Sequence, residues 1–274
     1  MKGEIDMESS AGRWACITGA TSGIGEAFAG EFAEQGYHLI LTGRNRAKLE
    51  YLARRLSRDY EINTETETRD LSKREEIEEL AGKLQKKKDL KILVNNAGFG
   101  TQCYFDRGDF SAYEDMLYVN ELAVMRLTRA ALPQMISAGD GMIINVSSTA
   151  AFTPYPLNAV YAASKTMVKL FSESLFLELQ DTGVYVQALC PGITRTEFHQ
   201  RMGLDEERIY KSKGIMKAMD AEEVVKISMK CARKKKAVCV PGFNNKIVRF
   251  ALKFMPGPLT CRIVKKRQMP SGRD

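Results

Sequence analysis

The sequence has little of several residue types, and each shortage excludes a class of protein. Among its 274 residues are 8 prolines and 21 glycines, too few for a collagen-like or linker-dominated chain. Its six cysteines form no CxxC pair, which favours reduced thiols over a disulfide framework. Two histidines argue against a histidine-rich zinc site, and we expect no bound metal.

Long apolar runs are also missing. Residues 1–10 lack the apolar core of a signal peptide, and no run approaches the ~20 residues that a membrane-spanning helix needs. We therefore expect a cytoplasmic protein. The chain contains 44% hydrophobic and 27% charged residues, a balance typical of a soluble globular protein with a sizeable core.

Charge is distributed unevenly along the chain. The net charge is +7, but residues 231–274 hold 12 lysines and arginines against Asp274 alone. Residues 231–274 thus carry +11, which leaves a net charge of −4 on the preceding residues. Because the body is slightly acidic, we expect no nucleic-acid partner for it.

Short apolar runs alternate with helical patterns along the chain. The expected strands are residues 14–18, 37–42, 62–68, 91–94, 142–146, 184–189 and 237–240. The expected helices are residues 24–35, 46–58, 111–137 and 160–180, with a further helix that Ser72 and Glu75 begin as a capping box. Repeated βα units with continuous apolar strands predict an α/β fold, in which helices cover both faces of a parallel sheet. No linker divides the chain, so we expect a single domain.

A glycine-rich turn links the first strand to the first helix. Gly19, Gly23 and Gly25 allow a tight turn and a close approach of the backbone to a pyrophosphate, which the helix N-terminus attracts. Thr21, Ser22 and Ile24 complete this predicted dinucleotide loop. Three glycines can also simply make a sharp turn, but the strand–turn–helix context favours the dinucleotide.

The end of the second strand points to the type of dinucleotide. At this position an acidic residue favours the ribose 2′-hydroxyl of NAD, whereas an arginine favours the 2′-phosphate of NADP. Arg44 stands here without an acid, so we expect NADP(H); the alternative is a solvated cation without a ligand. Asp70 and Leu71, after the third strand, are placed to flank the adenine.

Three residues suggest proton transfer. Tyr161 and Lys165 are one helical turn apart, and an ammonium beside a phenol lowers the phenol's pKa from its usual value near ~10. Ser148, at the end of the fifth strand, is placed to hydrogen-bond a carbonyl oxygen beside that phenol. A tyrosine and a lysine at this spacing often share nothing but a surface, so the pair gains weight from its context.

Taken together, these patterns resemble the short-chain dehydrogenase/reductase family. The resemblance depends on the glycine loop, on residues 95–98 (NNAG) after the fourth strand, and on residues 144–148 (INVSS) ahead of Tyr161. It covers roughly residues 14–242. It implies a single Rossmann-like domain, residues 1–243, with a doubly wound, seven-stranded parallel sheet and helices on both faces.

The resemblance also implies roles for individual residues. Tyr161 would be the general acid/base, Lys165 would lower its pKa and bind the nicotinamide ribose, and Ser148 would hold the substrate oxygen. Asn120 would anchor a proton-relay water with Lys165. Asn95 would tie the fourth strand to its neighbour. Further cofactor contacts are implied at Asn96, Ala97, Gly98, Pro191, Gly192, Ile193 and Thr196, the last two at the carboxamide. Ser22 stands where some NADP-using relatives have a basic residue, so the expectation of NADP(H) depends mainly on Arg44.

The substrate pocket is expected beyond the carboxyl ends of the strands. Its expected lining is Phe99, Phe152, Thr153, Tyr155, Phe198 and Met202. Residues 194–219, rich in methionine and aromatic residues, predict an apolar lid over a bulky lipophilic carbonyl, or else ordinary packing of a small helical subdomain. The sequence is most similar to the branch with 17β-hydroxysteroid dehydrogenases and long-chain 3-oxoacyl reductases, whose membrane anchors it lacks.

The tail, residues 244–274, predicts a basic amphipathic helix. Lys246, Arg249 and Lys253 share one face of residues 246–255, the asparagines at 244 and 245 are placed to cap its start, and residues 256–258 (PGP) end it. This helix suits an anionic membrane surface, acyl-CoA phosphates or an acidic carrier protein; alternatively it packs on the body or on a second subunit. The family resemblance implies a homodimer or homotetramer.

Two functions of different classes follow. The first is an NADPH-dependent oxidoreductase that interconverts a ketone and a secondary alcohol, on a 3-oxoacyl thioester or, alternatively, a steroid or another carbonyl compound. The second is an NADP(H)-sensing adaptor that acts through its tail. Because no catalytic position is substituted, we favour the enzyme.

Overall fold

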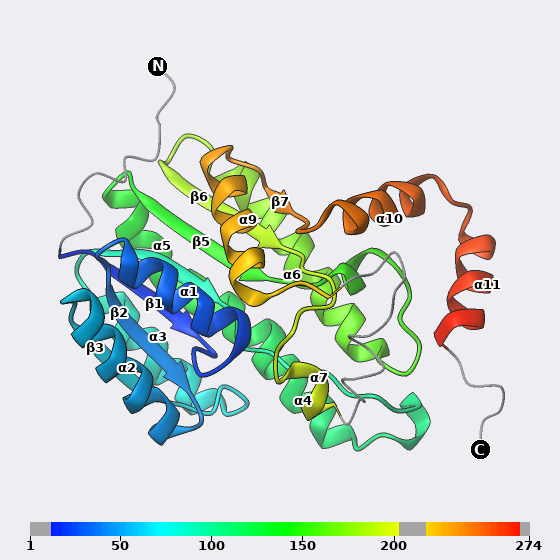
Figure 1. The fold of residues 1–274 in the computed structure, drawn as a ribbon, viewed down its shortest axis with the longest axis horizontal. Helices are drawn as coiled ribbons and strands as arrows, with labels where there is room; N and C mark the ends of the chain where they lie inside the picture. The colour runs from blue at the N-terminus through cyan, green and yellow to red at the C-terminus, as the bar shows by residue number, and fades with distance from the viewer. Residues whose placement is uncertain (1–11, 203–217, 269–274) are drawn as a thin grey trace.

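The structure is a computed structural model that describes residues 12–202 and 218–268 (Figure 1). Its centre is a seven-stranded sheet in the order β3-β2-β1-β4-β5-β6-β7, with every neighbouring pair parallel. The strands are β1 (Trp14–Thr18), β2 (His38–Gly43), β3 (Thr64–Thr68), β4 (Leu90–Asn95), β5 (Gly141–Val146), β6 (Val184–Leu189) and β7 (Val238–Cys239). The predicted α/β fold with a doubly wound parallel sheet is confirmed.

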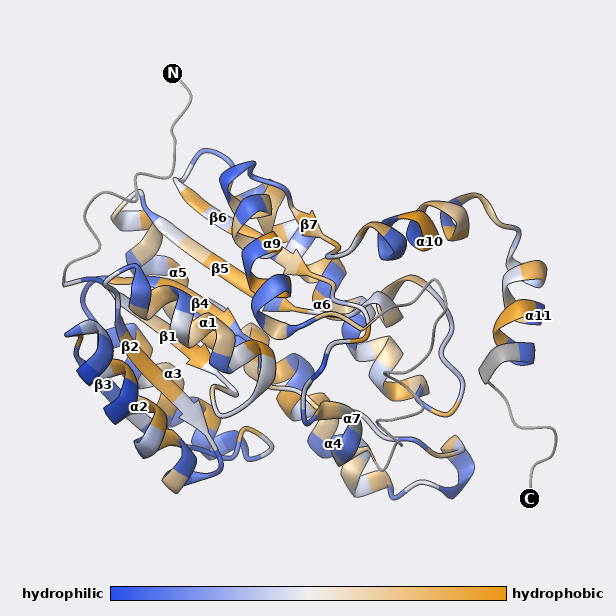
Figure 2. Ribbon diagram, viewed as in Figure 1, coloured by the Kyte–Doolittle hydropathy of each residue, from blue (hydrophilic) through white to orange (hydrophobic). Residues whose placement is uncertain are grey.

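Alternating side chains along the strands supply two separate cores, one on each face of the sheet. In β1, Ala15 and Ile17 join one core while Cys16 joins the other; in β2, Leu39 and Ile40 divide in the same way. A strand buried on both faces must be apolar throughout, which explains the continuous apolar runs of the sequence. In Figure 2 the central strands are accordingly mostly orange.

Each core is closed by a layer of helices (Figure 1). On one face lie α1 (Gly23–Glu34), α2 (Arg46–Tyr60) and α9 (Ala221–Arg233). On the other lie α3 (Arg74–Lys86), α5 (Ala123–Ser137) and α6 (Ala159–Glu178). Shorter elements follow the carboxyl ends of the strands: η1 (Phe105–Arg107), α4 (Phe110–Leu117), η3 (Thr149–Phe152) and α7 (Phe198–Arg201).

Two expectations about helices are wrong. The helix expected over residues 111–137 is interrupted by a π-helix, η2 (Tyr118–Leu122), between α4 and α5. The predicted capping box is also absent: the N-cap of α3 is Lys73, and the Ser72 hydroxyl donates to Asp70 Oδ1 at 3.0 Å instead. Ser72 bonds to the preceding Asp70 and not to the helix that follows, because a short polar side chain can form a local turn as readily as a helix cap.

The C-terminal segment continues from β7 into two helices that project beside the body, α10 (Phe243–Phe254) and α11 (Gly257–Gln268) (Figure 1). The N-cap of α10 is Gly242, so the expected asparagine cap is wrong; Asn245 Nδ2 donates to the carbonyl oxygen of Pro241 at 2.8 Å. Residues 256–258 end α10 as expected but also begin α11, which the sequence did not predict. Within the described ranges no helix is both long and apolar enough to cross a membrane.

Candidate active site

The predicted dinucleotide loop lies where the strand order reverses. The chain runs outward from β1 to β3 and then places β4 on the other side of β1. Such a reversal opens a crevice at the carboxyl ends of the two central strands. Residues 19–25 follow β1 and residues 96–98 follow β4, so both predicted cofactor segments meet at this crevice.

Close packing at the start of α1 needs glycine. A β-carbon on Gly25 would lie 2.5 Å from Asn96 Nδ2 and still closer to the carbonyl oxygen of Gly19. Gly23 has a φ of +57°, and a β-carbon there would lie 2.5 Å from Thr196 Cγ2. The loop therefore touches both other predicted cofactor segments, and two of the first three residues of α1, Gly23 and Gly25, have no side chain to cover the N–H groups that attract an anion. These features fit a bound pyrophosphate.

Side-chain hydrogen bonds join the ends of β1 and β4. Thr18 Oγ1 accepts from the N–H groups of Asn96 and Ala97, both at 2.9 Å. Asn96 Nδ2 in turn donates to the carbonyl oxygens of Thr18 at 2.9 Å and Gly19 at 3.1 Å. The Asn96 side chain therefore shapes the glycine loop, a role that its motif did not reveal.

Asn95 connects β4 to β5, as the family resemblance implied. Its Nδ2 donates to Asn145 Oδ1 at 2.8 Å and to Thr128 Oγ1 at 3.1 Å, and Asn145 Nδ2 continues to Ser172 Oγ at 2.9 Å. All four side chains are buried, where a polar group without a partner is costly. The chain of bonds fixes α5 and α6 relative to the central strands.

The residues expected around the adenosine have unequal exposure. Arg44 is exposed after β2, and among the described residues no carboxylate forms an ion pair with it, whereas Arg46 pairs with Glu50 at 2.6 Å. Its charge is therefore available to a phosphate. Asp70 Oδ1 accepts from Ser72, and the Leu71 side chain is buried in a core, so Leu71 can offer an adenine only its backbone.

Ser148, Tyr161 and Lys165 come together at the carboxyl end of β5. Ser148 is the N-cap of η3, where its Oγ accepts from the N–H of Ala150 at 3.1 Å. Tyr161 and Lys165 lie on α6, with the lysine nitrogen 5.7 Å from the centre of the phenol ring. Lys165 Nζ donates to the carbonyl oxygen of Val146 at 2.9 Å. The structure thus groups the three residues that the sequence singled out.

Burial dominates the protonation of this group. It raises the pKa of Tyr161 to about 12, against which the hydrogen bond with Ser148 acts more weakly. Burial also lowers the pKa of Lys165 to about 8, opposed by weaker Coulombic interactions with Cys190 and Glu121. The expectation that the ammonium holds the pKa of Tyr161 below its usual value is therefore wrong in this structure, because desolvation of the phenolate is the largest cause and raises that pKa.

Asn120 lies in the π-helix η2, and its side chain is fully buried. Its Oδ1 accepts from the N–H of Phe99 at 3.1 Å, and its Nδ2 donates to the carbonyl oxygen of Phe99 and to Ser164 Oγ, both at 3.0 Å. A β-carbon on Gly98 would lie 2.9 Å from Asn120 Oδ1 and 3.0 Å from Lys165 Nζ. The π-helix, which the sequence did not predict, thus carries a buried Asn120 whose Oδ1 lies beside Gly98, as Lys165 Nζ does.

Three of the expected substrate-pocket residues lie around Tyr161. Phe99, Tyr155 and Phe198 pack in one cluster with it, and the ring of Phe198 is 5.7 Å from the ring of Tyr161. Phe152 is not among them: it packs toward α10, with the Arg249 guanidinium 5.0 Å from its ring. The structure therefore does not group Phe152 with Tyr161, and its place in a substrate pocket stays a prediction.

The expected lid lies mostly outside the described residues. Leu204, Ile209, Tyr210, Ile215 and Met216 fall there, and Met202 is the last residue before them. Met219, at the other end, is buried in a sheet core and bridges to Thr194, so its place in a lid is wrong. The segment 191–196 itself meets η3, where Thr149 N donates to the carbonyl oxygen of Pro191 at 2.9 Å.

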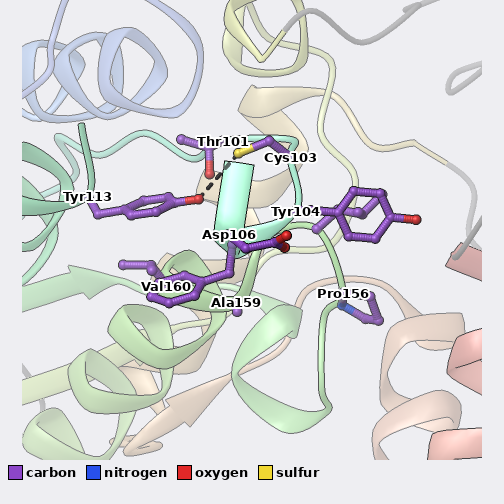
Figure 3. A pocket seen from close by; sticks show the side chains of 10 residues that line it. Thr101, Cys103, Tyr104, Asp106, Tyr113, Pro156, Ala159 and Val160 are labelled. Carbon is purple, nitrogen blue, oxygen red and sulfur yellow. Dashed lines mark hydrogen bonds between the residues drawn. The ribbon is translucent and has the colours of Figure 1, made fainter. Parts of the chain in front are cut away.

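A cavity of about 240 Å³ lies beside the Tyr161 cluster (Figure 3). Figure 3 shows Tyr113 and Cys103 pointing toward one another across it, with the Tyr113 hydroxyl 3.3 Å from Cys103 Sγ. Val160 lines the cavity, but Tyr161 does not, so the cavity adjoins the candidate catalytic group without containing it.

Comparison with known proteins identifies the family. The family described as short chain dehydrogenase matches residues 13–207, which is most of the chain. The chain therefore belongs to the short-chain dehydrogenase/reductase family. A short-chain dehydrogenase from Sphingobium yanoikuyae, solved in complex with NADPH, is 30% identical, with a TM-score of 0.80 over 95% of this chain and 98% of that one.

The match to two curated relatives covers a smaller share of each relative's length. Very-long-chain 3-oxoacyl-CoA reductase of Anas platyrhynchos is 33% identical over 199 residues, 71% of this chain and 64% of that protein. A human protein named Inactive hydroxysteroid dehydrogenase-like protein 1 is 35% identical over 188 residues, 68% of this chain and 57% of that protein. The matched part thus spans less than two thirds of each of these relatives.

Proposed function

We propose that this protein is an NADPH-dependent oxidoreductase that interconverts a ketone and a secondary alcohol. The grouping of Ser148, Tyr161 and Lys165 beside the crevice, with Asn120 and Lys165 both next to Gly98, carries this proposal. Identity to relatives does not carry it, because one relative at 35% identity is named inactive.

The nicotinamide dinucleotide, when bound, supplies the hydride. The loop from Gly19 to Gly25 would hold its pyrophosphate, and residues 96–98 and 191–196 would hold the nicotinamide end. Arg44 supports NADP(H), because an exposed guanidinium at the end of β2 that pairs with no carboxylate of the described residues suits a 2′-phosphate. The NADPH complex of the Sphingobium relative agrees with this choice.

The protonation of the site suits reduction. A phenol with a pKa of about 12 is protonated at neutral pH and can donate its proton to an alkoxide. Ser148 would hydrogen-bond the carbonyl oxygen, and the Lys165 ammonium would stabilise the phenolate that remains. The apolar rings of Phe99, Tyr155 and Phe198 favour a lipophilic ketone, and the 3-oxoacyl-CoA reductase relative makes a 3-oxoacyl thioester the first candidate.

The decisive experiment follows NADPH oxidation with a panel of simple ketones, 3-oxoacyl thioesters and steroids. We expect turnover with at least one lipophilic ketone, and Tyr161→Phe to lose it by a factor of about 100 or more while NADPH affinity is unchanged. Turnover that survives in Tyr161→Phe, or NADPH binding with no turnover of any carbonyl compound, would contradict the proposal; the latter result favours the adaptor.

A further inference from the structure

Helix α10 uses one face to pack on the body of the protein. Asn245, Val248 and Leu252 line its contact with η3, where Thr149 and Phe152 face them. Asn245 is buried, and a β-carbon on Gly192 would lie 2.5 Å from its Nδ2. The start of α10 is therefore fixed beside the predicted cofactor segment 191–196, at the carboxyl edge of the sheet.

The opposite face of α10 is apolar and uncovered. Phe243, Ile247, Phe250 and Phe254 recur at helical spacings of four and three residues, which places them on one face. They are between 48% and 76% exposed, although side chains of this kind are usually buried. Leu259 and Ile263 add a second exposed pair, one turn apart on α11. We call these six side chains the apolar ridge; Figure 2 shows apolar and polar residues interleaved along both helices.

The charged residues of α10 and α11 are all positive. Between Glu223 and Asp274 the sequence contains no acidic residue. Lys246 and Lys253 are exposed on α10, on a flank between the ridge and the packed face, and Lys265 and Lys266 are exposed on α11. An apolar stripe with lysines along its side matches a bilayer, whose acyl region takes the apolar groups and whose anionic headgroups take the cations.

We propose that α10 and α11 together bind the surface of an anionic lipid bilayer. A second copy of the chain fits the same features less well, because pairing two ridges would bring their lysine borders together, and like charges across an interface repel. Bound in this way, α10 and α11 hold the carboxyl edge of the sheet, with the predicted cofactor segment 191–196, close to the membrane. The proposal goes beyond the oxidoreductase function and does not depend on it.

The test is cosedimentation of the full chain with vesicles of phosphatidylcholine alone or with about 30 mol% phosphatidylserine, which supplies the surface charge. We expect binding to the anionic vesicles, weakened by high salt and by Lys246→Gln/Lys253→Gln. We expect Phe250→Ser/Phe254→Ser to raise the lipid concentration for half-binding about tenfold or more. Phe110→Ser, which removes a 65% exposed phenylalanine from α4, is the matched control and should bind like the wild type.

Three results would overturn the proposal. The first is that the wild type sediments with neither kind of vesicle. The second is that Phe250→Ser/Phe254→Ser binds anionic vesicles as well as the wild type does. The third result combines two measurements: the wild type does not sediment with vesicles, and light scattering shows a lower oligomeric mass for Phe250→Ser/Phe254→Ser than for the wild type. That result assigns the ridge to a second copy. NADPH oxidation with a water-soluble ketone, measured in parallel, separates failure of this proposal from failure of the enzyme assignment.

Discussion

Replacing Gly25 with alanine tests the packing on which the dinucleotide loop depends. The added β-carbon would lie 2.5 Å from Asn96 Nδ2 and closer still to the Gly19 carbonyl oxygen. Neither neighbour can easily move, because one is backbone and the other donates two hydrogen bonds to the end of β1. The substitution therefore has to push α1 away from the strand that it follows.

The expected size comes from two opposing effects. Alanine gains up to ~1 kcal/mol over glycine in a helix, whereas overpacking costs about 1–3 kcal/mol. We expect a net loss of about 1–2 kcal/mol in the free energy of unfolding, and each kcal/mol lowers the Tm by about 2–4 °C in a domain of this size. The displaced loop should also weaken NADPH binding by about tenfold or more, equivalent to ~1.4 kcal/mol.

Gly30, in the same helix, offers a matched control. A β-carbon there would meet nothing within 4 Å, so Gly30→Ala should keep NADPH affinity and raise stability by up to ~1 kcal/mol. Thermal unfolding and fluorescence titration with NADPH measure both quantities. If Gly25→Ala melts no lower than Gly30→Ala and binds NADPH as tightly, the close contact does not govern the loop and the reasoning is refuted.

Three further predictions concern separate parts of the site. Arg44→Glu should weaken NADPH binding about 10–100-fold, as expected for a lost charge-assisted contact, and leave NADH binding much less affected; equal losses in titrations with both would contradict the role of Arg44. Asn95→Ala should lower the free energy of unfolding by about 1–3 kcal/mol in urea, because Asn145 loses its buried donor. Lys165 has a pKa of about 8 when folded and an ordinary value of 10.5, so between these pH values the unfolded chain binds more protons and stability rises with pH. The stability of the wild type relative to Lys165→Met should therefore increase from pH ~7.5 to pH ~9.5, and a constant difference in urea midpoints would argue against a buried amine.

The sequence predicted features that local pattern decides. Continuous apolar runs mark strands buried on both faces, and the glycines of residues 19–25 mark a close helix–strand contact. It did not predict the π-helix at residues 118–122. The apolar spacing of a helix does not show whether its backbone hydrogen bonds span four residues or five. It also did not predict the contact of Phe152 with α10, because an aromatic side chain after a strand can face the site or a neighbouring helix, and here Arg249 of α10 lies over its ring.

The α10 helix shows the same limit for surfaces. From the sequence, packing on the body and binding to a membrane were alternatives for this helix. In the structure, the two opposite faces of α10 have different surroundings. Val248 and Leu252 face the body, while Phe250 and Phe254 face away from it. A single apolar pattern cannot tell a helix with one apolar face from a helix with two. That distinction needs the tertiary contact with η3.

Burial shifts the pKa values of the two central ionisable groups in opposite directions, and these shifts set the protonation state from which the proposed reaction starts. The charged forms of both are penalised, so the phenol of Tyr161 retains its proton to higher pH while the ammonium of Lys165 loses its proton more readily. At neutral pH the pair is a neutral phenol beside an ammonium. Because an alkoxide is a stronger base than a phenolate, proton transfer from Tyr161 to a newly formed alkoxide is favourable even at a pKa of about 12. The reverse transfer, from an alcohol, first needs a deprotonated Tyr161, which burial makes scarce. The site as described therefore holds the proton that reduction of a ketone consumes.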